Sequence, residues 1–316
     1  MGKKDLLMKD YLSDPKVFAD VFNYLLFHGE NRIDPDKLEE VDSTERVLLK
    51  ENNTDFAVQK YRDLLKRTVI RTDSSAVFVL LGIEAQSYID YAMPVRIMLY
   101  DALQYAGQVQ QSRLGSKGSS DEFLSGFLKE KHLKPVITAV VYLSPRPWDG
   151  VTSLRELFCT IDGKLIHYIQ DYKMLLLSPQ DLSLQDLGSF STDLGKVLAL
   201  LKAFESKGTF RSLMKKEEFR LIDRKTALFL KDFLDLRAEF AREEDKVDFH
   251  NAWNEIIEDE AAKARNIALS ESREETQKIA VQKMMEKLGL SMDNAMNVLD
   301  LSAAEREAVK RDLQNK

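Results

Sequence analysis

The chain has 316 residues, enough for one large domain or two smaller ones, and hydrophobic residues make up 44% of it. Its formal net charge of −6 excludes a globally basic surface, so a nucleic acid would have to meet a local patch or a bound metal ion. The single cysteine, Cys159, excludes a disulfide framework and a thiolate zinc site.

The N-terminal segment, MGKKDLLMKDYL, contains charges but no continuous apolar core, so it does not read as a signal peptide. No stretch of the sequence approaches the length of a membrane span. We therefore expect a cytoplasmic protein that does not contact a membrane.

The first part of the chain predicts one helix and one strand. Residues 5–30 carry apolar side chains at helical spacing, with Asp14 and Pro15 as a plausible N-cap and first helical residue. Residues 31–55 are polar and irregular, and residues 56–72 run into a first strand whose limits the sequence leaves unclear.

The central part alternates between strands and a helix. Residues 76–86 are rich in Val, Leu and Ile and predict a second strand, after which a helix is expected to begin near Pro94. The composition of residues 108–123 is typical of a loop, and it lacks the spacing of a phosphate-binding P-loop. Residues 135–144 form the clearest strand, and residues 164–177 suggest one or two more.

From residue 181 onward the pattern is helical, with helices expected at 193–206, 212–221 and 223–240. The order of elements predicts an α/β fold with a mixed sheet, followed by helical additions.

We divide the chain into three parts: an α/β domain over 1–180, a helical extension packed on it over 181–244, and a charged helical tail over 245–316. In the tail, Gly289 is placed as a helix C-cap, Ser291 as an N-cap, and Ser302 with Glu305 as a capping box. The mixed charges of the tail favour an interaction or dimerisation arm, and hence a homo-oligomer, over a DNA-reading helix-turn-helix.

Two polar side chains interrupt the apolar strand over 76–86. Glu84 and Gln86 lie two residues apart, so they share one face, and an unpaired buried carboxylate there would be costly. Asp63 lies at the start of the preceding strand, and a short hairpin would bring it beside Glu84. Two carboxylates in this arrangement could chelate Mg²⁺ or Mn²⁺ through oxygen.

These residues carry a family resemblance. The pattern consists of an Asp at the head of one strand, Glu-x-Gln at the end of the next, and a following helix that contains MPVRIMLY. Two further matching segments are FADVFNYLLF near the start and VVYLSPRPWDG later on. The sequence resembles the recombination-promoting nuclease or transposase-like (Rpn) family of the PD-(D/E)XK nuclease superfamily. The resemblance covers most of the chain, and it implies a restriction-endonuclease-like mixed sheet flanked by helices.

The resemblance also implies roles for individual residues. Asp63 stands for the metal-binding aspartate, and Glu84 for the strand-borne glutamate. Gln86 stands where the superfamily has a lysine, so it offers hydrogen bonds but no positive charge. Arg67, four residues after Asp63, could supply the missing charge.

Three further residues come from the flanking helices. Asp20 is a further acid that the superfamily places opposite the strands, and it is expected to help bind the metal. Arg96 and Tyr100 lie four residues apart on one helix face and could contact phosphate or orient Gln86.

The same residues have structural interpretations. Glu84 and Gln86 could be the solvated face of a half-buried sheet, Asp63 part of a surface ion pair, and Arg96 with Tyr100 a stack that caps the sheet. Asp20 could be a solvent-facing helix residue. Trp148 is interpreted as an aromatic plug of its loop.

The function that we expect is a metal-dependent endodeoxyribonuclease linked to recombination or transposition, with DNA as its partner. One alternative is a catalytically weak or inactive DNA-binding or assembly protein on the same fold. Another is a transposase with three catalytic acids on an RNase H-like sheet, but the sequence offers no decisive third acid.

Overall fold

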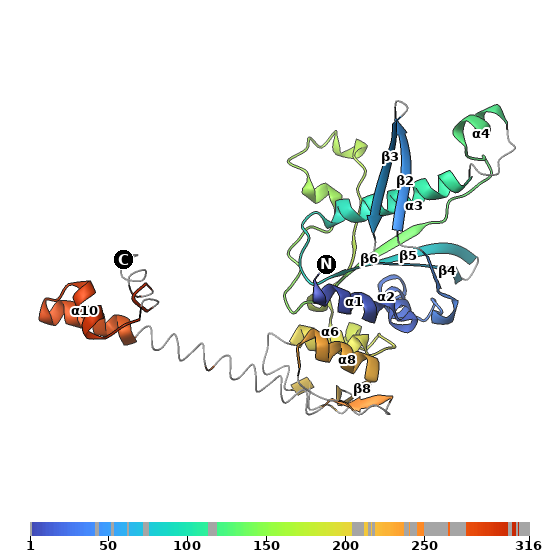
Figure 1. Ribbon diagram of the computed structural model, residues 1–316. Coiled ribbons are helices and arrows are strands. Elements are labelled where there is room, and N and C mark those ends of the chain that lie inside the picture. Colours follow the sequence, from blue (N-terminus) through green and yellow to red (C-terminus); the bar gives the residue numbers. More distant parts are fainter. Residues whose placement is uncertain are drawn as a thin grey trace. The chain divides into compact units, whose positions relative to one another are not determined.

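The computed structural model in Figure 1 describes most of the chain, namely residues 2–41, 44–51, 54–61, 63–71, 76–112, 119–203, 212–213, 216, 219–236, 240, 245–249, 265, 276–302, 305–307 and 309. It contains two compact units, residues 1–250 and residues 251–316.

A five-stranded mixed sheet forms the centre of the first unit. Its strands follow one another in chain order across the sheet: β1 (Glu39–Glu40), β4 (Leu64–Arg71), β5 (Ala76–Gln86), β6 (Val136–Tyr142) and β7 (Leu175–Leu177). β1, β4 and β5 pair antiparallel, whereas β5, β6 and β7 pair parallel.

Helices cover both faces of this sheet (Figure 1). On one face lies α3 (Met93–Ser112), whose Met93 and Ile97 pack against Val140 of β6. On the other face lie α1 (Lys3–Ser13) and α2 (Pro15–Phe27), and α1 contacts β5. The predicted α/β fold is therefore confirmed: a mixed sheet flanked by helices, consistent with the PD-(D/E)XK type.

The alternation of side chains along β5 explains the two layers. Leu81, Ile83 and Ala85 are buried on the face that the sequence predicted to be apolar. Leu80 is buried on the opposite face, where it packs with Val136 and with Tyr105 of α3. Because both faces are covered, β5 reads as an almost continuous apolar run until its last three residues.

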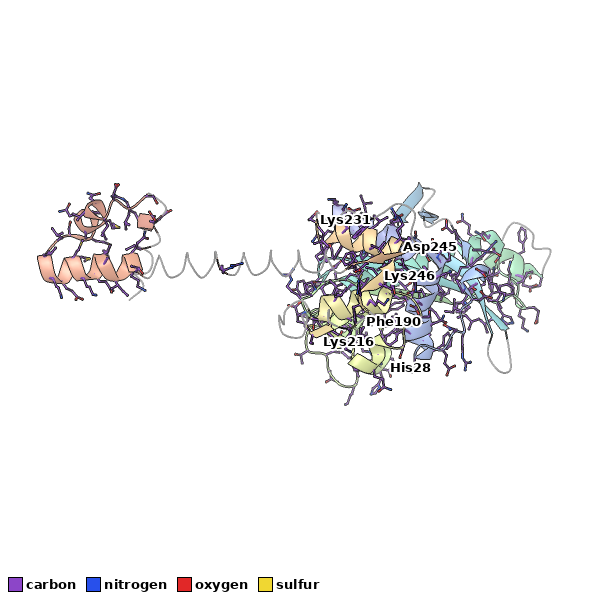
Figure 2. The ribbon with its side chains drawn as sticks, turned by 90° about the horizontal axis from the view of Figure 1, so that it is seen from below. His28, Phe190, Lys216, Lys231, Asp245 and Lys246 are labelled. Atoms are coloured by element: carbon purple, nitrogen blue, oxygen red, sulfur yellow. The ribbon has the colours of Figure 1, made fainter. Side chains whose placement is uncertain are left out.

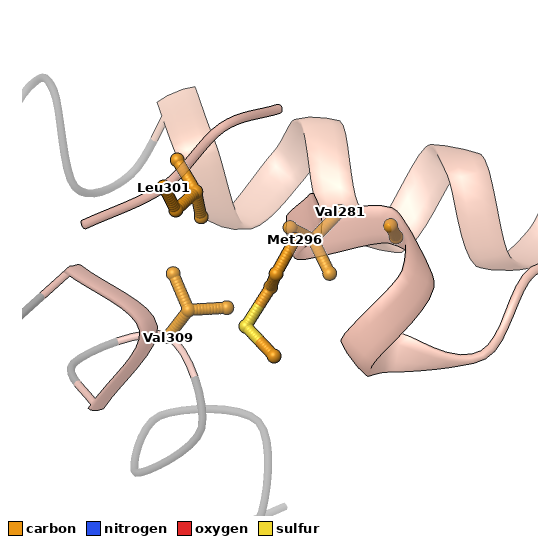
Figure 3. Close-up of a cluster of buried hydrophobic side chains, with 5 residues drawn as sticks. Val281, Met296, Leu301 and Val309 are labelled. Atoms are coloured by element: carbon orange, nitrogen blue, oxygen red, sulfur yellow. The ribbon is translucent and has the colours of Figure 1, made fainter. Parts of the chain in front are cut away.

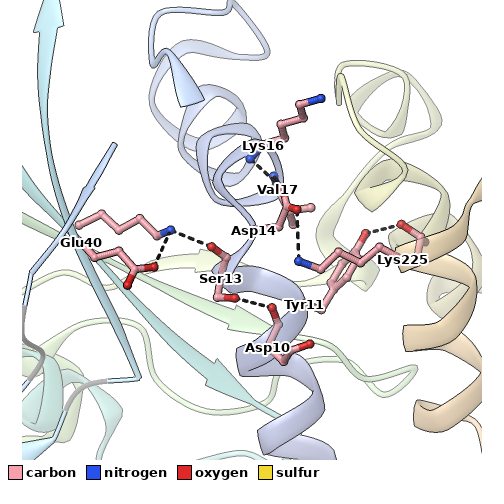
Figure 4. Close-up of polar contacts among 10 residues, drawn as sticks. Asp10, Tyr11, Ser13, Asp14, Lys16, Val17, Glu40 and Lys225 are labelled. Atoms are coloured by element: carbon pink, nitrogen blue, oxygen red, sulfur yellow. Dashed lines mark hydrogen bonds and ion pairs between the residues drawn. The ribbon is translucent and has the colours of Figure 1, made fainter. Parts of the chain in front are cut away.

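The junction of α1 and α2 is a point where several elements meet (Figure 4). Asp14 accepts hydrogen bonds from the backbone N–H groups of Lys16 and Val17, which makes it the N-cap of α2, with Pro15 as the first helical residue. Lys225, at the start of α8 (Arg224–Phe233), forms an ion pair with Asp14 at 3.2 Å. The predicted helix over 5–30 is thus two helices, because this cap starts a new one.

Buried side chains reinforce the same junction. Lys66 of β4 donates a hydrogen bond to the carbonyl oxygen of Ser13 at 2.7 Å, and its ammonium lies over the ring of Phe18. Tyr11 stacks on Phe229 of α8, and its hydroxyl is 3.1 Å from that of Thr226. α8 is therefore packed on α1.

Outside the central sheet, the first unit has a hairpin of β2 (Thr44–Glu51) and β3 (Thr54–Tyr61), and a pair of β8 (Leu221–Asp223) and β9 (Lys246–Asp248). The remaining helices of this unit, in chain order, are η1 (Pro35–Lys37), α4 (Ser120–Ser125), η3 (Leu154–Leu157), η4 (Ile166–Tyr168), η5 (Pro179–Asp181), α5 (Leu184–Leu187) and α6 (Leu194–Ala203).

Four expectations need correction. Residues 44–51, expected to be irregular, form β2. Pairing with β3 stabilises this strand, which its own sequence indicates only weakly. The loop expected over 108–123 starts only after α3 ends at Ser112, and it contains most of α4, whereas the one strand within 164–177, β7, agrees with the one or two that were expected. The helix expected over 212–221 meets a strand, β8, at Leu221, and the helix expected over 223–240 ends at Phe233.

The described part of the second unit is a small helical cluster. Residues 276–288 are helical, Gly289 follows with a positive φ of 64°, and α10 (Met292–Val298) begins after its N-cap Ser291. Ser302 and Glu305 form the predicted capping box. These helices enclose a core of their own, formed by Val281, Ala295, Met296, Leu301 and Val309 (Figure 3).

Candidate active site

Asp63 and Glu84 face each other across neighbouring strands. The register of β4 and β5 pairs Leu64 with Ile83, so Asp63 comes opposite Glu84. The backbone N–H of Asp63 donates to Glu84 Oε1 at 3.4 Å, and the backbone N–H of Ala85 donates to Asp63 Oδ2 at 3.0 Å. The two carboxylates therefore lie side by side at the end of β5, as the hairpin predicted.

Both acids are buried. Glu84 has 0% of its surface exposed and Asp63 has 5%. Burial raises the pKa of Asp63 above the usual value of an aspartate, and Asp5 raises it further, while the Ala85 N–H, Lys9 and Arg96 oppose this shift. The interpretation of Glu84 and Asp63 as surface residues is therefore wrong.

Arg96 is the cation that meets this pair. One guanidinium nitrogen lies 3.0 Å from Glu84 Oε2, and another lies 3.6 Å from Asp90 Oδ2. Arg96 Nε donates to the hydroxyl of Tyr100 at 3.1 Å, which explains the spacing of four residues on α3. Burial alone would lower the pKa of Arg96, but Glu84 and Tyr100 raise it above the usual value, so this side chain stays charged.

Gln86 lies beside the pair on the same strand face, with 3% of its surface exposed. The parallel register places it next to Tyr142 of β6. Gln86 Oε1 and the Tyr142 hydroxyl are both buried, and neither has a hydrogen-bond partner within the described part of the chain. Buried polar atoms without a partner are costly, and they are expected where a ligand or water completes the bonding.

Two residues of α1 act on the site although the sequence does not indicate them. Asp5 accepts a hydrogen bond at 2.6 Å from the hydroxyl of Ser87, the first residue after β5, and Asp5 and Lys9 both act electrostatically on Asp63. Asp5 also accepts from the backbone N–H of Gly2 at 3.0 Å. Its local sequence signals only a helix start, since the contact with Ser87 spans 82 positions.

Asp20 is buried but is engaged elsewhere. Its carboxylate accepts four hydrogen bonds, from the backbone N–H and the hydroxyl of both Ser191 and Thr192, at 2.6–3.0 Å. All four of these donors come from residues 191 and 192, not from the strands that carry Asp63 and Glu84. The interpretation as a solvent-facing residue is wrong, and the metal role expected for Asp20 stays a prediction.

Two other predictions concern side chains near the site. Arg67 forms an exposed ion pair with Glu39 of β1 at 2.5 Å, so Arg96 is the better placed cation. Trp148 packs edge-on against the ring of Tyr142, with centroids 5.2 Å apart, in agreement with its interpretation as a plug.

The donor set fits one hard divalent cation. Asp63 and Glu84 supply carboxylate oxygens, and beside them lies the carbonyl oxygen of Gln86, which has no hydrogen-bond partner within the described residues and can hold a water. The described residues contain no group of three or more His, Cys, Asp or Glu side chains that could hold a metal. Mg²⁺ commonly needs only one or two carboxylates because it keeps several waters, whereas a three-acid transposase site would need more.

A cavity of about 310 Å³ lies elsewhere, lined by residues of α5 and α6 and by Leu213, Lys216 and Phe219. Phe190 and Lys216 are two of its lining residues (Figure 2). No carboxylate is part of its lining, so it does not offer the chemistry of the Asp63 and Glu84 pair.

With this geometry in hand, the comparisons with known proteins become informative. Residues 3–219, which include every candidate site residue, match the family model described as "Putative transposase, YhgA-like". The chain belongs to this family. The comparison with curated proteins and the comparison with solved structures each found no match.

Membership of the YhgA-like transposase family supports a role related to transposition or recombination, and with it an interaction with DNA. In the described part of this transposase-like chain, no helix combines the length and apolarity that a membrane crossing requires.

Proposed function

We propose that this protein is a metal-dependent DNA endonuclease that hydrolyses phosphodiester bonds. The observation that carries the proposal is the pair of buried carboxylates at adjacent ends of β4 and β5: Glu84 accepts from the backbone N–H of Asp63, Asp63 accepts from that of Ala85, and Arg96 pairs with Glu84. Burying two acids side by side destabilises a fold, and such an arrangement is typical of sites that bind a cation.

Asp63 and Glu84 would hold Mg²⁺ or Mn²⁺. The metal would supply the chemistry that side chains lack at neutral pH, a lowered pKa of water and neutralisation of phosphate charge. Because Arg96 lies on Glu84, its guanidinium must leave that carboxylate before a cation binds. Once displaced, Arg96 is placed to meet a phosphate oxygen of the substrate.

Gln86 would orient the attacking water. Its carbonyl oxygen has no other hydrogen-bond partner within the described residues, so it can accept a hydrogen bond from that water. The amide cannot supply the charge of a lysine, so the stabilisation of the developing phosphate charge would rest on Arg96 and the metal.

The test is nicking of supercoiled plasmid in Mg²⁺ or Mn²⁺ by the native protein, Asp63→Asn and Glu84→Gln. These substitutions keep shape and hydrogen-bonding oxygens but remove charge. We expect each to lower the nicking rate by at least about 10²-fold, the scale of losing one charge-stabilising group. Asp121→Asn removes an exposed acid of α4 and serves as the matched control. Equal rates in all four proteins would overturn the proposal.

The second candidate is a DNA-binding or assembly protein without catalysis. The observation that favours it is Arg96, which already neutralises Glu84 without a metal. If the native protein shifts DNA in a gel but does not nick it in either metal, this second function replaces the first.

A further inference from the structure

The loop that follows β5 presents two exposed aromatic rings beside the acids. Tyr88 and Tyr91 expose 52% and 61% of their surfaces, and both lie within five residues of Gln86. Single exposed aromatic residues are common on proteins, but two in one short loop at the edge of a catalytic site are not needed for packing.

This loop is held in place by side chains from three other segments. Ser87 donates to Asp5 of α1, and Asp90 accepts from the backbone N–H of Ala92 and pairs with Arg96 of α3. The hydroxyl of Tyr91 is hydrogen-bonded to Asp149 in the loop after β6. The two rings are therefore carried on a fixed support while most of their surface stays open to a partner.

The surroundings favour a nucleic acid as that partner. Arg96 reaches from the acids to Asp90 in this loop, and the exposed Arg146 is close enough to Tyr91 to act on it electrostatically. Cations beside exposed aromatic rings are the combination by which proteins hold a phosphate backbone and stack its bases. In a duplex the faces of the bases are hidden by their neighbours, so stacking on tyrosine requires an unpaired base.

We propose that Tyr88 and Tyr91 form a stacking platform for unpaired bases, and that the substrate is DNA with a single-stranded segment at the cleaved bond. The part of this inference that concerns cleavage rests on the proposed function. The binding that it predicts is measurable without cleavage.

The experiment measures fluorescence anisotropy of a labelled 12-nucleotide single-stranded DNA, the duplex of the same sequence, and the corresponding single-stranded RNA. The full chain carrying Asp63→Asn is used in EDTA, so nothing is cleaved. We expect the single-stranded DNA to bind more tightly than the duplex, and Tyr88→Ala or Tyr91→Ala to weaken it about 5- to 150-fold, which corresponds to about 1–3 kcal/mol per stacked base.

Two variants act as controls. Tyr88→Phe keeps the ring and should bind as the parent does. Phe78→Ala removes a ring of β5 that is 61% exposed. Phe78 lies eight residues before Gln86, roughly 26 Å along the strand, so this substitution should not change the DNA affinity.

The outcomes separate the two proposals. Equal affinity for single strand and duplex, equal effects of Phe78→Ala and Tyr88→Ala, or tighter binding of the RNA overturns the platform while plasmid nicking still stands. Conversely, affinity that depends on Tyr88 in a protein that never nicks plasmid supports the platform and removes the nuclease.

Discussion

At the scale of single residues, Gln86 combines two opposite properties. Its carbonyl oxygen is buried without a hydrogen-bond partner in the described residues, which lowers stability, and it lies where a water would have to be held for catalysis. Function and stability should therefore respond in opposite directions when this side chain is changed.

Gln86→Leu tests this opposition, because leucine has a similar size and no polar atoms. We expect the nicking rate to fall by about 10²-fold and the free energy of unfolding to rise by about 1 kcal/mol, since an unsatisfied buried group is removed. Urea denaturation and plasmid nicking measure the two quantities. A variant that is both less active and less stable would show that Gln86 serves the fold.

Asp63 gives a second residue-scale prediction, which concerns pH. Its pKa is raised by burial, so the folded state favours the protonated acid; this stability is present at low pH and is lost as pH rises through the raised pKa. In EDTA, Asp63→Asn should therefore be more stable than the native protein at pH 7, and this difference should shrink toward pH 4.

The same shift predicts the behaviour of the metal. A cation needs the ionised carboxylate, so the Mg²⁺ concentration that gives half of the maximal nicking rate should rise as pH falls. Because the pKa of Asp63 is raised, this rise should begin at a pH above the pKa of an ordinary aspartate. Nicking measured across Mg²⁺ titrations between pH 5 and pH 8 checks this. A half-saturating concentration that does not change with pH would contradict it.

At the scale of elements, some strands and helices could be predicted and others could not. β5 and β6 could be predicted because each is a nearly continuous run of apolar residues, and Pro94 indicates the start of α3. β2 could not be predicted because a partner strand stabilises it. In the site, alternation predicted the shared face of Glu84 and Gln86, but the contacts of Asp5 and Asp20 come from segments far away in the chain.

The cap of α2 is the element whose contribution is easiest to isolate. Asp14 accepts from two backbone N–H groups and pairs with Lys225 (Figure 4). Asp14→Ala removes both interactions, whereas Asp14→Asn keeps the capping oxygen. We expect the free energy of unfolding of Asp14→Ala, measured by urea denaturation, to be about 1 kcal/mol lower than that of Asp14→Asn. Equal values for the two variants would mean that the cap contributes nothing.

At the scale of the whole molecule, the second unit has a hydrophobic core that uses only its own side chains among the described residues. Met296 is fully buried in this cluster (Figure 3), and partly buried methionines pack against the cluster. Such a core can be weakened without changing the sheet that carries Asp63 and Glu84.

Met296→Ala in the full chain should destabilise this unit by about 2–5 kcal/mol, the usual cost of truncating a buried large side chain. Hydrogen exchange followed by mass spectrometry should show faster exchange over residues 276–302 and unchanged exchange in β5 and β6. The exposed Val298, as Val298→Ala, is the matched control and should leave both regions unchanged. Faster exchange in β5 would show that the two units are coupled.

The four hydrogen bonds of Asp20 have a consequence for the way the protein is made. Their donors lie 171 and 172 positions after the carboxylate, so this acid has no native partners until the ribosome has released residue 192. Translation proceeds from the N-terminus, and β4 and β5 emerge long before that point. While the earlier strands are being synthesised, α2 therefore lacks the hydrogen bonds of Asp20. These contacts, and with them the complete fold of the first unit, form late in synthesis.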